Sequence, residues 1–189
     1  MDINLKVIIV GGSAGSLEPL FTIIKELQPE FNWPIIIVLH RMKNVESNFV
    51  EVLKMRSGKK NVKEINDKEE LLMNTIYVAP ANYHLLVEDN HVLALDYSEV
   101  VNFSRPSIDV AFESFADVFK MNLTGILLSG SNADGAKGLH RIRQKGGRII
   151  VQDPATADSE EMPKAGLTMN KSAEIANPMQ ITELLNKMI

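Results

Sequence analysis

The feature that most constrains this fold is an apolar run that stops at a turn of small residues. The run Leu5–Val10 is followed at once by Gly11-Gly-Ser-Ala-Gly-Ser16. Apolar residues then recur with helical spacing, so a helix is expected over about Ser16–Leu27. A buried strand, a tight turn and a helix in this order form the first unit of an α/β fold, whose turn lies at the carboxyl edge of the sheet.

The turn itself allows three interpretations. Gly11-x-Ser13-x-Gly15 fits the G-x-S-x-G pattern, which presents a serine nucleophile on a sharp strand-to-helix turn. A phosphate- or dinucleotide-binding turn has the same order of elements, although Ser13 and Ser16 stand where G-x-G-x-x-G needs its second and third glycines. A structural turn with no ligand is the third.

The composition suits one soluble domain spanning residues 1–189. With 45% hydrophobic and 23% charged residues, the chain has an ordinary globular composition. The net charge of −4 gives no reason to expect a nucleic-acid or anionic-membrane partner. The absence of cysteine excludes disulfides and thiolate chemistry, and no apolar run approaches a membrane span. We therefore expect a cytoplasmic domain with no signal peptide, metal or cofactor.

The remaining chain alternates between short apolar runs and helical patterns. This predicts a doubly wound, mostly parallel sheet with helices on both faces and one antiparallel β-hairpin. A charged turn is expected at Asn66–Glu70 and an irregular loop at 97–106. Strands are expected at Ile35–Leu39, Val62–Ile65, Thr75–Ala79, Leu123–Leu128, Arg148–Val151 and Ala173–Ala176, the hairpin at His84–Glu88 and His91–Leu95, and helices at Ser47–Arg56, Ile108–Lys120, Ala136–Lys145, Pro163–Met169 and from Pro178.

Four reactive side chains closely follow buried strands: Ser13, His40, Asp134 and Asp153. A hydroxyl, an imidazole and a carboxylate on one sheet edge are the parts of a nucleophilic triad. The imidazole would take the serine proton and return it to the leaving group, and the carboxylate would fix the imidazole tautomer. Sequence spacing leaves Asp134 and Asp153 as alternatives for the carboxylate.

The sequence constrains the residues that would support the triad less than the triad itself. Backbone amides near Ser13, including that of Ala14, and those of the Gly130–Asn132 loop are candidates for oxyanion stabilisation. Arg105 either binds a substrate carboxylate or ties down its own loop. Ser107 is expected to cap its helix and Asp109 to stabilise the first turn. The other histidines are read as packing or surface residues (His84, His91) and as solvated (His140).

The ordered set of motifs resembles the catalytic domain of the chemotaxis receptor methylesterases. The resemblance implies the triad Ser13, His40 and Asp134, hydrolysis of glutamate methyl esters on the chemoreceptor cytoplasmic domain with release of methanol, and deamidation of receptor glutamines. It also implies a chemotaxis kinase or a separate receiver protein as a further partner. The motifs are Gly11–Gly15, Val38–Met42, Tyr77–Pro80 with His84, Arg105–Asp109, Leu128–Ala136 with Gly138, Gln152-Asp153 and Met162-Pro163.

The chain also departs from that family's usual pattern. Ser16 and Leu17 replace a glycine and a proline, and Ser131 replaces a methionine at the expected substrate rim. These differences motivate an alternative, a non-catalytic or altered-specificity domain that binds chemoreceptor helices or an anionic ligand in the same cleft. A third reading is an esterase acting on another ester. We expect no receiver domain in this chain; if the chain is the whole protein, regulation by phosphorylation of a fused receiver domain is excluded.

Overall fold

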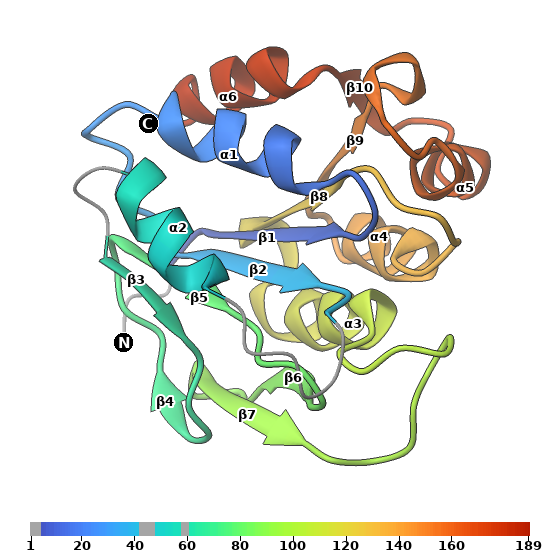
Figure 1. Ribbon diagram of the computed structural model, residues 1–189. Coiled ribbons are helices and arrows are strands. Elements are labelled where there is room, and N and C mark those ends of the chain that lie inside the picture. Colours follow the sequence, from blue (N-terminus) through green and yellow to red (C-terminus); the bar gives the residue numbers. More distant parts are fainter. Residues whose placement is uncertain (1–4, 42–47, 58–60) are drawn as a thin grey trace.

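A computed structural model describes residues 5–41, 48–57 and 61–189 of the chain (Figure 1). Its strands are β1 (Val7–Gly12), β2 (Ile35–Leu39), β3 (Asn61–Glu64), β4 (Glu69–Glu70), β5 (Thr75–Val78), β6 (His84–Val87), β7 (Val92–Asp96), β8 (Leu123–Leu127), β9 (Arg148–Gln152) and β10 (Glu174–Ala176). Its α-helices are α1 (Leu17–Lys25), α2 (Phe49–Ser57), α3 (Ile108–Phe119), α4 (Ala136–Gln144), α5 (Glu161–Met169) and α6 (Pro178–Asn186).

The main sheet has seven strands in the order β10-β9-β8-β1-β2-β5-β3, and all neighbouring pairs are parallel. Strand β1 lies at its centre between β2 and β8. The pairing continues to the strand ends, where Gly12 lies beside Leu39 and Gly11 beside Leu127. The segments that follow β1, β2 and β8 therefore leave the sheet at the same edge. This confirms the predicted doubly wound fold.

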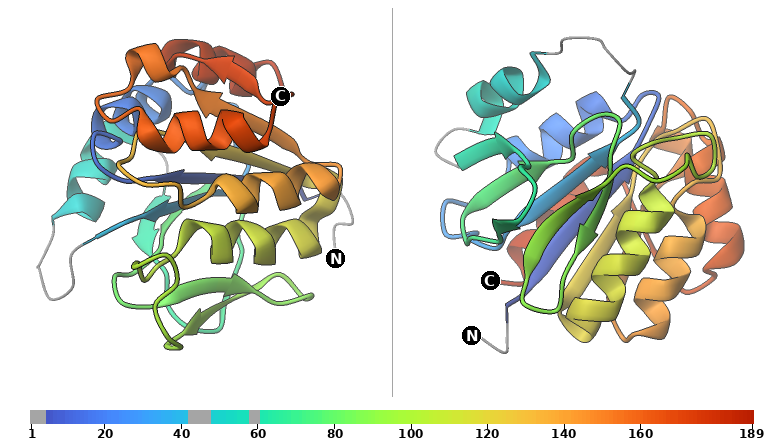
Figure 2. Two further views of the ribbon diagram at one scale, coloured as in Figure 1. Left: turned by 90° about the vertical axis from the view of Figure 1, so that its right-hand side faces the viewer. Right: turned by 90° about the horizontal axis from the view of Figure 1, so that it is seen from below.

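Helices cover both faces of the sheet (Figures 1 and 2). Helices α1, α2 and α6 enclose one apolar core, to which Phe21, Leu53 and Leu185 contribute. Helices α3, α4 and α5 cover the other face, where Phe112 and Phe115 are fully buried. The β1 side chains alternate between these cores, Val7 and Ile9 in one and Ile8 and Val10 in the other. Such double burial explains the continuous apolar run in the sequence.

A small antiparallel sheet, in the order β4-β7-β6, packs against α3 (Figure 2). Its hairpin β6–β7 was predicted, but β4 was not, because Glu69–Glu70 was read as part of a charged turn. Glu69 lies opposite Leu93 and Glu70 opposite Val92, and the two-residue strand carries no alternating apolar pattern. An ion pair from Lys63 to Glu69 holds this segment beside β3.

The observed boundaries differ from the predicted ones by a few residues. Strand β1 extends through Gly11 and Gly12 because both glycines still pair with β2. Helix α5 begins at Glu161, so that Pro163 lies in its first turn, where its missing N–H is tolerated. Three parts of the sequence prediction lie outside the described residues: the start of a helix at Ser47, the break at 58–60, and Met42 of the second motif.

Helices α3 and α4 approach closely at Gly138. A Cβ atom there would lie 2.4 Å from Cβ of Phe112 and 3.1 Å from the Asp109 backbone. We expect Gly138→Ala to lower the free energy of unfolding by about 1–3 kcal/mol, since neither neighbour can yield without a backbone shift. Thermal or denaturant unfolding measures the loss. The control is Lys137→Ala at the adjacent exposed position, whose free energy of unfolding should lie within about 0.5 kcal/mol of wild type. Equal stability of the two variants would contradict the close approach of the helices.

Candidate active site

The turn after β1 is fixed from both sides. Gly15 has φ 76°, a left-handed conformation that favours glycine. The carbonyl of Ser13 accepts hydrogen bonds from the Ser16 hydroxyl (2.6 Å) and the Ser16 N–H (3.1 Å). Ser129, just after β8, accepts from the Ser13 N–H through its carbonyl at 2.9 Å and donates from its hydroxyl to the Ala14 carbonyl at 2.7 Å. Ser13 is thus held between the tips of neighbouring strands.

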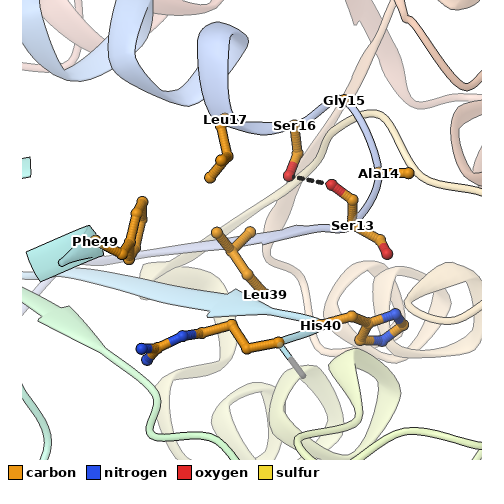
Figure 3. Close-up of a pocket in the computed structure, with 9 residues that line it drawn as sticks. Ser13, Ala14, Gly15, Ser16, Leu17, Leu39, His40 and Phe49 are labelled. Atoms are coloured by element: carbon orange, nitrogen blue, oxygen red, sulfur yellow. Dashed lines mark hydrogen bonds between the residues drawn. The ribbon is translucent and has the colours of Figure 1, made fainter. Parts of the chain in front are cut away.

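His40 follows β2 directly, and its N–H donates to the Gly12 carbonyl at 3.2 Å. Ser13 and His40 both line a pocket of about 290 Å³. Figure 3 shows the Ser13 side chain pointing to the side of the pocket that carries the imidazole. The Ser13 hydroxyl forms no hydrogen bond with the described part of the chain, so it is free to turn toward a base. The pocket is lined by Ser13–Leu17, Leu39–Arg41 and Phe49.

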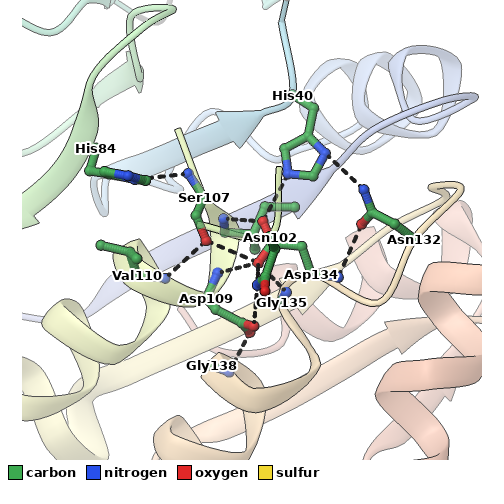
Figure 4. A network of polar contacts seen from close by, with 11 residues as sticks. His40, His84, Asn102, Ser107, Asp109, Val110, Asn132, Asp134, Gly135 and Gly138 are labelled. Atoms are coloured by element: carbon green, nitrogen blue, oxygen red, sulfur yellow. Dashed lines mark hydrogen bonds and ion pairs between the residues drawn. The ribbon is translucent and has the colours of Figure 1, made fainter. Parts of the chain in front are cut away.

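The imidazole of His40 faces the carboxylate of Asp134 (Figure 4). Its Nε2 lies 2.8 Å from Oδ2 of Asp134, and the Asp134 side chain is fully buried. A carboxylate accepts, so Nε2 carries the proton and Nδ1 is the nitrogen left with a lone pair. Nδ2 of Asn132 lies 3.5 Å from this Nδ1, while Oδ1 of Asn132 accepts from the Asp134 N–H at 3.0 Å.

The Asp134 carboxylate is surrounded by donors. Burial raises its pKa, but the hydrogen bonds from His40, Asn102 and the backbone outweigh burial and lower the pKa to about 2. Asp134 therefore stays ionised beside His40 at neutral pH. Besides His40, its donors are Ile108 N–H (2.7 Å) on Oδ2, and Asn102 Nδ2 (2.7 Å), Ser107 Oγ (3.0 Å), Asp109 N–H (3.1 Å) and Gly135 N–H (3.1 Å) on Oδ1.

A second carboxyl, that of Asp109, lies next to Asp134. Its Oδ1 accepts from the Gly138 N–H at 2.8 Å and its Oδ2 from Nδ2 of Asn102 at 3.0 Å. Burial and, to a smaller extent, the charge of Asp134 raise the pKa of Asp109 to about 6. The sequence explained Asp109 only as a favourable charge in the first turn of its helix, yet it is 5% exposed and belongs to the polar network of the site.

The two candidate carboxylates lie in different surroundings. Asp153 follows β9, which is separated from β1 by β8. Its Oδ1 accepts from the Ala155 N–H at 3.0 Å and caps the 3₁₀ turn Pro154–Thr156. The carboxylate that contacts His40 is Asp134.

Arg105 contacts its own loop and does not line the pocket that holds Ser13. Its guanidinium donates to the Tyr97 carbonyl (3.0 Å) and to Oδ1 of Asn82 (2.9 Å) and stacks on the Tyr97 ring. Of the two interpretations offered by the sequence, the contacts favour the tie that holds the loop.

The predicted oxyanion donors fall into two groups. The N–H groups of Ala14 and Gly15 form no hydrogen bond with the described part of the chain, and both residues line the pocket. The Gly130 N–H is already bonded to the Ser159 carbonyl at 3.0 Å, so it is not available. Ser131 is exposed and lies outside the pocket lining. The Ser13–Gly15 turn is therefore the better candidate for stabilising an oxyanion.

The other histidines lie outside the Ser13 pocket. His84 is buried; its Nδ1 accepts from the Ser107 N–H at 3.2 Å and its Nε2 donates to the Glu99 carbonyl at 2.9 Å, so it packs against the start of α3. His91 stacks on Phe119. His140, which was expected to be solvated, is half-buried: its Nδ1 lies 3.3 Å from Oδ1 of Asn170 and its Nε2 lies 3.1 Å from Nε2 of Gln144.

Sequence reasoning missed the roles of Asn102 and Asn132 and placed Ser107 only as a helix cap. Ser107 does cap α3, yet its hydroxyl also donates to Asp134. Asn102 lies in the segment read as an irregular loop. Their positions in the sequence could have indicated these roles. Ser107 and Asp109 belong to a motif singled out by resemblance, and Asn132 directly precedes Ala133-Asp134.

The two carboxyls predict opposite contributions to the pH dependence of stability. The pKa of Asp109 rises from about 3.8 to about 6 on folding, so its contribution becomes destabilising as pH rises through this window. The pKa of Asp134 falls to about 2, so its stabilising contribution is present above about pH 4 and is lost as pH falls toward 2.

We expect Asp109→Asn to remove the loss of stability that ionisation of the Asp109 carboxyl causes as pH rises. Thermal unfolding at about pH 4.5 and about pH 7.5 measures it, and the change in Tm from the lower to the higher pH should be more favourable in the variant than in wild type. The comparison uses the pH difference within each protein, so an overall loss of stability does not obscure it. An identical pH dependence in both proteins would contradict the raised pKa of Asp109.

Fold and site together define the class of the protein. It is a doubly wound α/β protein that carries a serine turn and a histidine–carboxylate pair on adjoining strand tips, the arrangement expected of a serine hydrolase. The chain belongs to the CheB methylesterase family, whose model matches residues 8–185. Within the described residues, no helix is long and apolar enough to cross a membrane, and no group of three or more metal-ligating side chains is present.

Relatives agree with this assignment. A Leptospira interrogans protein, provisionally named protein-glutamate methylesterase/protein-glutamine glutaminase, is 39% identical over 96% of this chain and 93% of its own length. Proteins with that activity name from Geobacter metallireducens and Thermotoga maritima are 32% and 28% identical, and the chain spans about half of their lengths. The crystal structure of the Thermotoga maritima CheB methylesterase catalytic domain superposes with a TM-score of 0.91 over 97% of this chain and 98% of that one, at 28% identity.

Proposed function

We propose that this protein is a serine hydrolase that removes methyl esters from glutamate side chains in the cytoplasmic domain of chemoreceptors, releasing methanol. The observation that carries the proposal is the 2.8 Å contact between His40 and Asp134 at the strand tip beside the Ser13 turn. Family membership supports the substrate, because the relatives are named for this activity. Hydrolysis of receptor glutamine amides, with release of ammonia, is the second reaction in those names.

In the proposed mechanism the Ser13 hydroxyl turns onto Nδ1 of His40 and gives up its proton as Oγ attacks the ester carbonyl. Asp134 keeps the proton on Nε2 and stabilises the imidazolium that forms. The free N–H groups of Ala14 and Gly15 are placed to stabilise the negative oxygen of the tetrahedral intermediate.

Collapse of this intermediate breaks the bond between the carbonyl carbon and the methoxy oxygen. Nδ1 of His40 returns its proton, and methanol leaves with the glutamyl group attached to Ser13. Water then attacks the acyl-enzyme with the same imidazole as base, which restores Ser13 and gives a glutamate side chain.

The lining of the pocket suits a side chain rather than a free ion. Leu17, Leu39 and Phe49 provide an apolar wall beside Ser13. Arg41 is held to Glu64 at 2.6 Å and lies over the Phe49 ring, so its charge is already paired. A neutral methyl ester loses less hydration on entering such a pocket than an anion does.

The direct test is methanol release from a methylated chemoreceptor fragment incubated with the purified protein. We expect time-dependent methanol that scales with protein concentration, and ammonia from a receptor that carries glutamine at the same sites. Absence of methanol with every methylated receptor supplied would contradict the proposal. A chemotaxis kinase or a separate receiver protein as partner stays a prediction, as does the single-domain organisation.

A non-catalytic or altered-specificity domain is the second candidate, motivated by Ser16, Leu17 and Ser131. Ser16 is buried and its hydroxyl is directed to the Ser13 carbonyl, and Leu17 is part of the pocket wall. A serine-directed phosphonate separates the candidates: stoichiometric labelling of Ser13 supports the hydrolase, and absence of labelling in folded protein supports a binding domain. Labelling without methanol release would indicate an esterase with a different substrate.

A further inference from the structure

The loop between β7 and α3 contains a tight turn with two residues in the left-handed conformation. Val101 and Ser104 exchange backbone hydrogen bonds of 3.2 and 3.0 Å around Asn102 and Phe103. Asn102 has φ 51° and Phe103 has φ 62°. Asparagine adopts this conformation readily, whereas an aromatic residue seldom does. The pattern is that of a type I′ turn, in which both central residues need positive φ.

The turn presents its two central side chains differently. The Phe103 side chain is fully exposed, so burial does not explain its strained conformation. The Asn102 amide is directed inward, to the carboxyls of Asp109 and Asp134 (Figure 4). Both residues line a second cleft of about 300 Å³ together with the two carboxyls and Lys137.

One nitrogen atom bridges the two acids. Nδ2 of Asn102 lies 3.0 Å from Oδ2 of Asp109 and 2.7 Å from Oδ1 of Asp134. Asp134 has four further protein donors besides His40, whereas Asp109 accepts from the Gly138 N–H, and the Gly135 N–H also contributes to lowering its pKa. Two buried carboxylates that lie side by side repel each other, and Asn102 is the side chain whose amide offsets this repulsion by donating to both.

We propose that Asn102 is a positioning residue of the site: its amide holds the Asp109 and Asp134 carboxylates together, so that Oδ2 of Asp134 stays aimed at Nε2 of His40. The effect on turnover rests on the proposed function, whereas the bridge between the carboxyls does not. Asn102 touches no reacting atom and acts through Asp134.

Few other charged groups lie near the Asp109 and Asp134 carboxylates. Asp109, in the first turn of α3, faces Asp134 of the β8–α4 loop, and Lys137 of the first turn of α4 lines the same cleft. His40 reaches the pair only through Asp134. No ion pair of Lys137 with Asp109 or Asp134 occurs in the described part of the chain, so the cation does not replace the amide bridge.

The test replaces Asn102 while keeping its backbone conformation. Asn102→Gly tolerates positive φ and removes the amide, and Asn102→Asp keeps the side-chain shape but substitutes an acceptor for the donor. Asn74→Gly is the matched control, because Asn74 is an exposed asparagine with φ 53° in the turn before β5, remote from the site. Thermal unfolding establishes that each protein is folded.

The primary readout is the titration of the Asp109 carboxyl carbon by NMR, assigned by its absence in Asp109→Asn. Wild type should titrate at about 6. Loss of the amide removes a hydrogen bond that lowers the pKa of Asp109, so the midpoint should rise by about one pH unit in Asn102→Gly and further in Asn102→Asp. It should not move in Asn74→Gly. On methylated receptor, kcat of Asn102→Gly should fall about 10-fold with KM within about twofold, as expected for misalignment at the site.

An unchanged Asp109 midpoint in folded Asn102→Gly and Asn102→Asp would overturn the inference. It would also be overturned if both variants unfold while Asn74→Gly folds, since Asn102 would then serve folding alone. The titration needs no substrate. A wild-type protein that releases no methanol would therefore reject the proposed function and leave the bridge to be judged by its own result.

Discussion

Ser13→Ala should lower turnover of a methylated receptor by roughly 10⁴–10⁶-fold, the scale observed when a triad nucleophile is removed. The alanine removes only Oγ, and that hydroxyl makes no hydrogen bond with the described part of the chain. The hydrogen bonds that fix the turn involve the backbone of Ser13, so the fold should be retained. Methanol release measures turnover, and thermal unfolding measures stability.

The matched control is Ser172→Ala, an exposed serine in the loop between α5 and β10. It should keep wild-type turnover. Retention of most activity in Ser13→Ala would rule out nucleophilic catalysis at this residue. A fall of the same size in Ser172→Ala would indicate that the assay responds to something other than the pocket.

The second large effect is expected from Asp134→Asn, for which we predict a loss of about 10⁴-fold in kcat. Each contact of the carboxylate comes from a donor, including Nε2 of His40 and the N–H groups of Ile108 and Asp109. An amide NH₂ placed among these donors has no acceptor to bind, and it favours the tautomer of His40 with the proton on Nδ1. A protonated Nδ1 cannot accept the proton of Ser13.

Asp153→Asn is the corresponding control, because it is the carboxylate that sequence spacing could not distinguish from Asp134. Its side chain caps a 3₁₀ turn by accepting one N–H, which asparagine also does, so activity should stay within about twofold of wild type. Methanol release and thermal unfolding of both variants test the pair. A larger loss in Asp153→Asn than in Asp134→Asn would contradict the assignment of the carboxylate.

The parts of the fold that follow from the sequence are those with strong periodicity. β1 and β2 are buried on both faces and read as unbroken aliphatic runs, and the small-residue turn after β1 is unmistakable. Because both strands are parallel, the order strand–turn–helix also places Ser13 and His40 at one edge. That Asp134 also reaches His40 depended on β8 pairing with β1, which the apolar run alone does not specify.

The supporting network was not predictable in the same way. Asn102 reaches the acids from a loop whose turn depends on two residues with positive φ, and Phe103 gives no sequence signal for such a turn. Asp109 could be recognised as helical, but its contact with Gly138 depends on the close approach of α3 and α4. Long-range contacts of this kind are set by tertiary packing, whereas local patterns report only the element to which a residue belongs.

The start of α3 has a consequence for the conditions under which the enzyme can work. The N–H groups of Ile108 and Asp109 point at Asp134 as they would at a dissolved phosphate or sulfate. Here the anion is the carboxylate of Asp134, which is part of the same chain and is shielded from solvent. This negative charge therefore does not depend on an anion from the buffer, and changes in ionic strength should leave it in place beside His40.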